Sequence, residues 1–320
     1  MSTLVTGAAG FLGSHVVETL LRRGDTVVGI DNVNDYYPVH LKRNNLELLK
    51  ELGNFTFIEG DITDLPLLED SFRKFKPTRI AHIAARAGVR PSIADPLLYS
   101  DTNITGTLNL LELSKQGDIE SFVLTSSSSV YGNSTAIPFK EEDSATDKPI
   151  SQYAATKKAT ELLAYTYFHL YGLPINIIRP FTLYGPRGRP DMAPWLFLKA
   201  ALTGGVIKQF GDGSTRRDYT FIGDFVPGFV AALDRPMGYE IFNLGNSETV
   251  SLKEMLQVVS EVTGKELNIE LLPMQPGDVE CTNADISKAR AKLGYNPQTP
   301  LKEGMAIFHD WFVSEGHHNL

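Results

Sequence analysis

Short apolar runs alternate with longer segments of helical periodicity through the first half of the chain. Buried strands are predicted at Thr3–Thr6, Thr26–Asp31, Phe55–Glu59, Arg79–Ile83, Ser121–Ser126 and Ile175–Arg179. Helices are predicted at Phe11–Arg23, Lys42–Leu52, Pro66–Phe75, Pro96–Gln116 and Ser151–Tyr171. This alternation is typical of an α/β protein with a doubly wound parallel sheet, in which ligands bind outside the carboxyl ends of the strands.

The rhythm changes after Pro180, where Gly and Pro become frequent between Tyr184 and Pro194. A later apolar run, Glu240–Leu244, is expected to return to the main sheet as a further strand. We therefore expect a Rossmann-type domain over residues 1–180, to which 222–245 return. Residues 181–221 and 246–320 would form a smaller, substrate-binding domain.

Composition narrows the class of protein. The net charge of −8 argues against nucleic acid as the main partner. One cysteine in 320 residues excludes an internal disulfide and fits a reducing compartment. The chain enters a strand at Thr3, which leaves no room for a leader or anchor, and no apolar run reaches membrane-spanning length. Seven histidines show no metal-ligand spacing. We expect a cytoplasmic enzyme without a metal.

A Gly-rich turn follows the first strand and opens the first helix. Gly7, Gly10 and Gly13 flank Phe11 and Leu12 with the spacing G-x-x-G-x-x-G, which lets a pyrophosphate approach the helix N-terminus. Asp31 ends the second strand. Its carboxylate suits both ribose hydroxyls and would repel a 2′-phosphate, so the pattern favours NAD over NADP. The alternative is a purely structural strand–helix turn.

Two further positions carry candidate chemistry. Tyr153 and Lys157 lie four apart on one helix face, where the ammonium would lower the pKa of the phenol and make it a usable general base. Alone, this pattern is often surface decoration. Asp61 and Ile62 follow the third predicted strand. Asp61 is expected either to contact an adenine or to cap the next helix.

Several longer segments resemble one known superfamily. They are His82–Ala85, Ser126–Gly132, Tyr153–Lys157, Arg179–Pro186 and Arg217–Tyr219. They are similar to the sugar-nucleotide epimerase/dehydratase branch of the extended short-chain dehydrogenases/reductases, and the likeness covers nearly the whole chain. It implies NAD as cofactor, a UDP-sugar substrate and a homodimer paired through the helices at Pro96–Gln116 and Ser151–Tyr171. The alternative interpretation is that these two helices only cover the sheet.

The resemblance also implies residue roles. Ser127 would bind the reacting sugar hydroxyl beside Tyr153, and Arg217 would bind the diphosphate. The remaining implied contacts are with NAD for Asn32, Ile62, Ala84, Ala85 and Asn103, and with the uridine ribose for Asp278.

The two residues before Val130 narrow the choice of activity within this superfamily. Dehydratases of this family carry Asp-Glu there and UDP-glucuronate decarboxylases carry Glu, whereas this chain has Ser128 and Ser129, whose hydroxyls cannot replace a carboxylate. Epimerisation needs no such extra acid. Asp31–Tyr37, Ala87–Arg90, Gly188–Met192 and Leu272–Val279 resemble UDP-glucuronate 4-epimerases. Pro38 and Pro180 depart from that pattern.

A glucuronate oxidised at C4 is a β-keto acid, which loses carbon dioxide unless its carboxylate is held. Arg189 is the candidate clamp, with Ser128 and Thr182 as added hydroxyl donors. The competing interpretation of Arg189 is a solvated loop charge or a structural contact. Arg90 is expected to bind diphosphate or carboxylate, or to have no role.

Alternatives stay open for the function and for several side chains. The function is also compatible with a 4-epimerase of UDP-glucose or UDP-N-acetylglucosamine, or with a non-catalytic nucleotide-sugar or NAD-binding protein. His82 is expected to pack at the end of its strand, and the Ser126–Ser129 run lacks the glycines of a nucleophile elbow. The aromatic cluster from Tyr165 to Tyr171 is expected in a core or a subunit interface.

Overall fold

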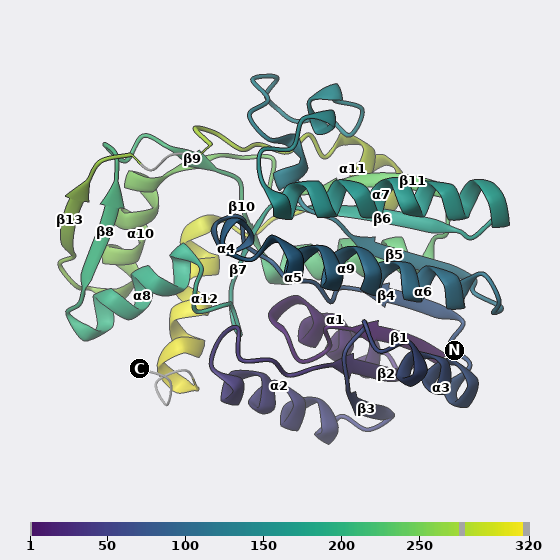
Figure 1. Ribbon diagram of the computed structural model, residues 1–320. Helices are drawn as coiled ribbons and strands as arrows, with labels where there is room; N and C mark the ends of the chain where they lie inside the picture. Colours follow the sequence, from purple (N-terminus) through teal and green to yellow (C-terminus); the bar gives the residue numbers. More distant parts are fainter. Residues whose placement is uncertain (1, 275–278, 316–320) are drawn as a thin grey trace.

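A seven-stranded sheet dominates the computed structural model, which describes residues 2–274 and 279–315 (Figure 1). All its strands are parallel, in the order β11-β6-β5-β4-β1-β2-β3. They are β1 (Ser2–Thr6), β2 (Thr26–Asp31), β3 (Phe55–Glu59), β4 (Arg79–His82), β5 (Ser121–Thr125), β6 (Ile175–Pro180) and β11 (Tyr239–Leu244). The α/β doubly wound prediction is confirmed, and the order reverses between β1 and β4, where such sheets bind ligands.

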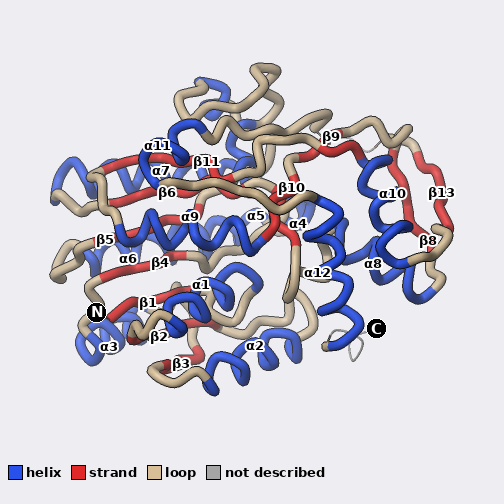
Figure 2. Tube along the Cα trace, turned by 180° about the vertical axis from the view of Figure 1, so that it is seen from behind, coloured by secondary structure: helices blue, strands red, loops and turns tan. Residues whose placement is uncertain are grey.

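Helices cover both faces of this sheet (Figures 1 and 2). One face carries α1 (Phe11–Arg22) and α9 (Ile222–Asp234), with α2 (Val39–Glu51) beside α1 and α11 (Ser287–Leu293) beside β11. The other carries α3 (Leu65–Phe75), α6 (Gly106–Ser114) and α7 (Gln152–Tyr171). In the described part of the chain, no helix has the length and apolar character needed to cross a membrane.

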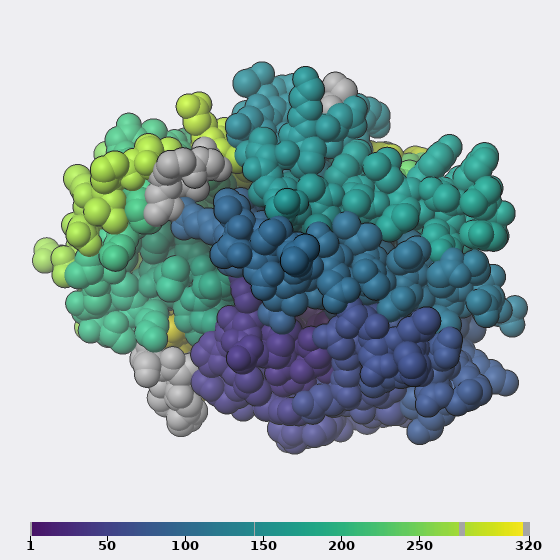
Figure 3. All heavy atoms as spheres, viewed as in Figure 1, coloured from purple at the N-terminus to yellow at the C-terminus, as the bar shows by residue number. Residues whose placement is uncertain are grey.

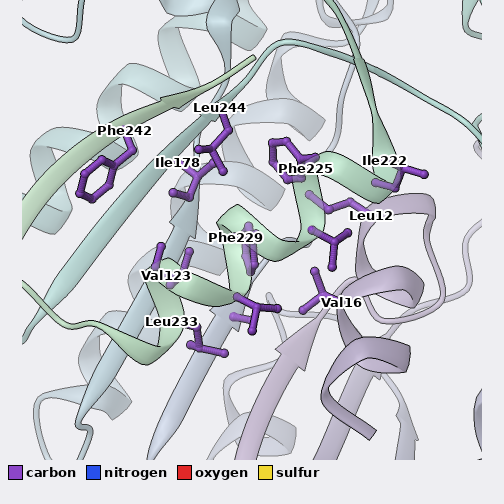
Figure 4. Close-up of a cluster of buried hydrophobic side chains, with 14 of the residues drawn as sticks. Leu12, Val16, Val123, Ile178, Ile222, Phe225, Phe229, Leu233, Phe242 and Leu244 are labelled. Carbon is purple, nitrogen blue, oxygen red and sulfur yellow. The ribbon is translucent and has the colours of Figure 1, made fainter. Parts of the chain in front are cut away.

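The sheet has a hydrophobic core on each face, because successive side chains of a strand point to opposite faces. Neighbouring β1 residues point to opposite faces, so Val5 packs with α1 and α9 while Leu4 packs with α3, α6 and α7. Figure 4 shows the first of these cores, in which Phe225 and Phe229 of α9 lie against strand residues such as Val123. Burial on both faces is why the strands read as continuous apolar runs.

The predicted helix Pro96–Gln116 is interrupted, which corrects the sequence-based expectation. It consists of α5 (Pro96–Ser100), a π-helical turn (Asp101–Thr105) and α6. The turn holds Asn103, which is 1% exposed. The side chain of Asn103 donates to the Arg86 carbonyl oxygen at 3.0 Å and to Thr156 Oγ1 at 3.0 Å. Such bulges are rare in helices and recur at functional sites.

A smaller lobe packs beside the carboxyl ends of the strands (Figure 1). Its helices are α8 (Ala193–Thr203), α10 (Leu252–Thr263) and α12 (Leu301–Ser314), and its core centres on Trp195, Met255 and Phe308. The short strand pairs are β8 (Val206–Phe210) with β13 (Asn268–Leu272), β7 (Thr182–Tyr184) with β10 (Tyr219–Phe221), and β9 (Arg216–Arg217) with β12 (Val250–Ser251). Shorter elements are α4 (Val89–Ala94) and the 3₁₀ turns Ser128–Tyr131 and Ser144–Asp147. The return of β11 to the sheet is confirmed, and the exact domain division stays a prediction.

Asp218 ties together segments that are distant in sequence, so replacing it is expected to weaken the fold. Its carboxylate is 0% exposed and accepts N–H groups from Asn246 at 2.7 Å and from Ser247 and Ala284 at 3.0 Å. Asp218→Asn sets an amide N–H₂ against one of these donors. We expect a loss of about 2–3 kcal/mol in the free energy of unfolding, measured by urea denaturation.

The matched control for Asp218→Asn is Thr220→Val, which removes only the hydroxyl that Asp218 accepts at 3.1 Å. It should cost about 1 kcal/mol or less. Equal losses in the two variants would show that Asp218 is not the anchor of these segments.

Candidate active site

One large cavity opens at the carboxyl ends of the central strands, with a volume of about 430 Å³. It brings together most of the residues that the sequence nominates. They are Gly7, Gly10, Phe11, Leu12, Gly13, Asp31, Asn32, Asp61, Ile62, Ala84, Ala85, Ser127, Ser128, Tyr153, Lys157, Thr182 and Arg189. The structure therefore places the dinucleotide-type turn and the Tyr/Lys pair in a single cavity.

The Gly-rich turn is shaped by close backbone contacts. Gly7 has φ +72°, and a Cβ there would lie 2.8 Å from the Ala84 nitrogen. A Cβ at Gly13 would lie 1.9 Å from the Gly7 carbonyl oxygen. Side chains are thus excluded at both positions, and the N-terminus of α1 faces the cavity, as a pyrophosphate site requires.

Two carboxylates line the cavity beyond β2 and β3. Asp31 is buried and accepts the Ala9 and Val33 N–H groups at 3.1 and 2.8 Å. Asp61 accepts from the Asn32 side chain at 2.5 Å. The alternative that Asp61 caps a helix is wrong, because Asp64 caps α3 by accepting the Leu67 N–H.

Tyr153 and Lys157 project from α7 into the cavity, one helical turn apart. Burial raises the pKa of the Tyr153 phenol, while a hydrogen bond with Ser127 and the guanidinium of Arg189 lower it. Lys157 donates to the Thr125 carbonyl oxygen at 2.8 Å. This corrects the expectation that Lys157 lowers the Tyr153 pKa, since Ser127 and Arg189 do so in this structure. Burial also lowers the pKa of Lys157 to about 8.

Arg189 reaches the same cavity from the loop between β7 and α8. Its Nε and Nη2 donate to the two carboxylate oxygens of Asp191 at 3.0 and 2.5 Å, and its guanidinium lies over the Tyr36 ring at 5.5 Å. Arg189 is not a solvated loop charge, because its side chain is 21% exposed and lies near the candidate base. The alternative of a structural contact, here with Asp191, stays open beside the predicted carboxylate contact. Ser128 and Thr182 line the cavity as well.

Three predicted residues within the described part of the chain do not line the cavity. Asn103 lies behind it and accepts the Arg86 N–H at 2.7 Å, so it fixes a segment of the wall and does not face the cavity itself. Arg90 is exposed on α4, 5.8 Å from the Phe210 ring, and Arg217 lies in β9. Asp278 lies outside the described residues. The ligand roles of these four stay predictions.

The sequence-based reasoning missed other cavity residues, among them Tyr36, Tyr37, Lys42 and Arg86. Lys42 donates to the Asn34 carbonyl oxygen at 2.8 Å and lies over the Tyr37 ring. The Asn-Asp-Tyr-Tyr segment served only as a mark of resemblance, although two adjacent tyrosines after a strand end were a signal. In the part of the chain that the structure describes, no three His, Cys, Asp or Glu side chains group as metal ligands would.

A parallel sheet, a glycine-rich turn and a Tyr/Lys pair in one cavity are typical of a dinucleotide-dependent enzyme. Comparison with known proteins identifies the same class. A sequence model described as GDP-mannose 4,6 dehydratase matches residues 4–308. The chain belongs to the NAD-dependent sugar-nucleotide epimerase/dehydratase family of extended short-chain dehydrogenases/reductases.

The similar proteins include UDP-glucuronate 4-epimerases. A UDP-glucuronate 4-epimerase of Thermodesulfobacterium geofontis is 46% identical over 309 residues, covering 96% of this chain and 95% of that protein. UDP-glucuronate 4-epimerase 4 of Arabidopsis thaliana is 44% identical over 98% of this chain and 76% of its own. The crystal structure of UDP-glucuronic acid 4-epimerase from Bacillus cereus, in complex with UDP-glucuronic acid and NAD, has a TM-score of 0.89 at 37% identity, covering 98% and 99%.

Proposed function

We propose that this protein is an NAD-dependent 4-epimerase that interconverts UDP-glucuronate and UDP-galacturonate. The observation that carries the proposal is the distribution of charge in the cavity. Among the described residues that line it, the only carboxylates are Asp31 and Asp61, which follow β2 and β3. Near Tyr153 the cavity presents hydroxyls and the Arg189 guanidinium, which suit an acidic sugar and offer no acid for water elimination.

The residues present fit NAD. Gly7 lets the turn pack directly against the Ala84 backbone, and the N–H groups at the start of α1, which faces the cavity, would bind a pyrophosphate. Asp31, which lines the cavity, would accept the adenosine ribose hydroxyls, with Asp61 near the adenine. When bound, NAD supplies a reversible hydride acceptor for C4 of the sugar.

Tyr153 performs the proton transfer in the proposed mechanism. Its phenolate oxygen takes the proton of the C4 hydroxyl as that carbon is oxidised, and Ser127 orients the same hydroxyl. The 4-keto sugar then turns about its bond to the diphosphate and presents its other face. Tyr153 returns the proton to the oxygen at C4. Because burial raises the pKa of the phenol, the Arg189 guanidinium and the hydrogen bond with Ser127 would be needed to favour phenolate.

A carboxylate bound at Arg189 serves two purposes. It selects an acidic sugar, and it holds the C5–C6 bond near the plane of the keto group, where decarboxylation is slow. Ser128 and Thr182 would add hydroxyl donors from the same cavity wall. The B. cereus enzyme supports this assignment, because it binds UDP-glucuronic acid on a chain that resembles this one over 98% of its length.

The competing function is epimerisation of a neutral UDP-hexose. A UDP-glucose 4-epimerase from Thermotoga maritima, in a crystal structure with UDP-glucose, has a TM-score of 0.90 at 32% identity. Separate incubations with UDP-glucuronate, UDP-glucose and UDP-N-acetylglucosamine, read by NMR, test the choice. We expect UDP-galacturonate from the first and no product from the others. Turnover of UDP-glucose would refute the acid specificity, and no turnover at all would favour a non-catalytic binding protein.

A homodimer is expected through α5, α6 and α7, whose residues form the blue and teal surface of Figure 3. Leu97, Leu162 and Leu170 are 80%, 59% and 60% exposed on these helices, so pairing would bury apolar side chains. Light scattering at micromolar concentration should give twice the chain mass, and Leu162→Glu should halve it. A wild-type monomer would contradict the pairing.

A further inference from the structure

Glu161 is a buried carboxylate that pairs with two cations, Arg179 and Lys158, and acts electrostatically on a third, Lys157. Glu161 lies on α7 one turn after Lys157, and Arg179 of β6 donates its Nε and Nη2 to both Glu161 oxygens at 2.8 Å. Lys158 Nζ lies 3.6 Å from the same carboxylate. Glu161 and Arg179 are each 1% exposed. Across residues 2–274 and 279–315, no other carboxylate forms an ion pair with these cations.

The same carboxylate is tied to the strand end that carries the candidate catalytic serine. Ser126 Oγ donates to Glu161 Oε1 at 2.6 Å. Ser126 and Ser127 both line the cavity. Lys157 closes the loop of contacts, because its ammonium donates to Thr125 at the end of β5. Glu161 therefore links α7 to β5 directly under the reacting groups.

We propose that Glu161 is a positioning residue whose buried carboxylate keeps Lys157 in its cationic form and holds the Ser126–Ser127 segment in place. Glu161 is not among the catalytic or binding residues named above. Its proposed role rests on the proposed 4-epimerase activity. Glu161 does not line the cavity and acts only through Lys157 and Ser126.

Charge explains why Lys157 depends on Glu161. Lys157 is 4% exposed, and burial lowers its pKa to about 8, against which Glu161 is the group that raises it. Although burial opposes it, Arg179 keeps the pKa of Glu161 below its ordinary value, so Glu161 is ionised. Loss of this negative charge therefore favours neutral Lys157 at a lower pH.

Other titratable groups around this cluster do not supply the missing charge. His82 faces Lys157 from β4, but burial lowers its pKa to about 3, so it is neutral. The Tyr131 phenol accepts from Arg179, and the Tyr239 phenol donates to the Glu161 carbonyl oxygen at 3.0 Å. The Glu141 carbonyl oxygen accepts from Arg179, but its carboxylate binds the Asn243 N–H.

The test is the alkaline limb of the pH profile of kcat/KM for UDP-glucuronate. Glu161→Gln keeps the shape and removes the charge, so the limb should move to lower pH by about one unit. Arg179→Gln removes the cation that keeps Glu161 ionised, so Glu161 should take up a proton more readily and the limb should again move to lower pH. Ser126→Ala cuts the link to the strand but keeps the charge, so kcat should fall while the limb stays. Glu161→Asp should restore the wild-type limb.

A readout independent of turnover is the Lys157 pKa, measured by NMR of the lysine Cε and Nζ signals and assigned with Lys157→Arg. It should fall in Glu161→Gln and stay in Ser126→Ala. An unchanged Lys157 pKa in both charge variants overturns the proposal, even if Glu161→Gln loses activity. If the wild type turns over no UDP-sugar while the Lys157 pKa moves as expected, the proposed function fails and the electrostatic role of Glu161 stands.

Discussion

Tyr153→Phe is expected to abolish epimerisation while the protein still folds and binds NAD and UDP-glucuronate. The change keeps the ring, which is in edge contact with Tyr99, and removes only the hydroxyl that Ser127 and Arg189 act upon. Loss of a general base costs on the order of 10² to 10⁴ in rate. The measurement is the initial rate of UDP-galacturonate formation by NMR, with ligand binding checked by calorimetry.

The matched control is Tyr99→Phe, which also removes one phenol beside the cavity. Tyr99 donates to the Ala87 carbonyl oxygen at 2.7 Å and does not line the cavity. Its replacement should change the rate by less than about tenfold, since only neutral hydrogen bonds, to Ala87 and with Tyr36, are lost. Near-normal turnover by Tyr153→Phe would remove Tyr153 from the mechanism, and an equal loss in both variants would point to packing.

The local pattern of apolar residues in the sequence was sufficient to predict the strands of the main sheet. β2 and β3 have the bounds that their apolar runs predict, although β2 is almost wholly buried and β3 is an edge strand of half-buried and exposed residues. The break between α5 and α6 was not visible, since it depends on Asn103 bonding to Arg86 and Thr156, which are distant in sequence. The strand pairs of the smaller lobe were missed for a related reason: β9 and β12 have two residues each, too few for a period.

The candidate site was likewise predictable only where its residues lie in contiguous sequence motifs. Residues in contiguous motifs, such as Gly7 and Tyr153, were predicted and do line the cavity. What sequence reasoning lacked were partners: Asp191 holds Arg189, and Glu161 lies between Arg179 and Ser126. The direction of the Tyr153 pKa shift needed burial, which no spacing reveals. Charge pairing and desolvation are properties of the fold, so they appear only with coordinates.

Arg189→Ala is expected to raise the KM for UDP-glucuronate and to let part of the 4-keto intermediate lose carbon dioxide. Asp191 engages the Nε and Nη2 side of the guanidinium. A guanidinium carries five N–H donors, so this side-on pair leaves the Nη1 end to receive a second carboxylate. A charge-assisted contact of that kind contributes about 1.5–3 kcal/mol, or roughly a tenfold to 150-fold change in KM.

Decarboxylation is the more specific consequence of removing Arg189. Without the clamp, the C5–C6 bond rotates toward the perpendicular of the keto plane, where it breaks, carbon dioxide leaves and C5 is protonated. A UDP-pentose product should then appear beside the epimer in mass spectrometry, with reduced nicotinamide absorbance where the keto sugar escapes. Arg189→Lys, which keeps the charge and loses the fork, should fall between the wild type and Arg189→Ala. If Arg189→Ala keeps its affinity for UDP-glucuronate and yields only epimer, the hydroxyls of Ser128 and Thr182 hold the carboxylate instead.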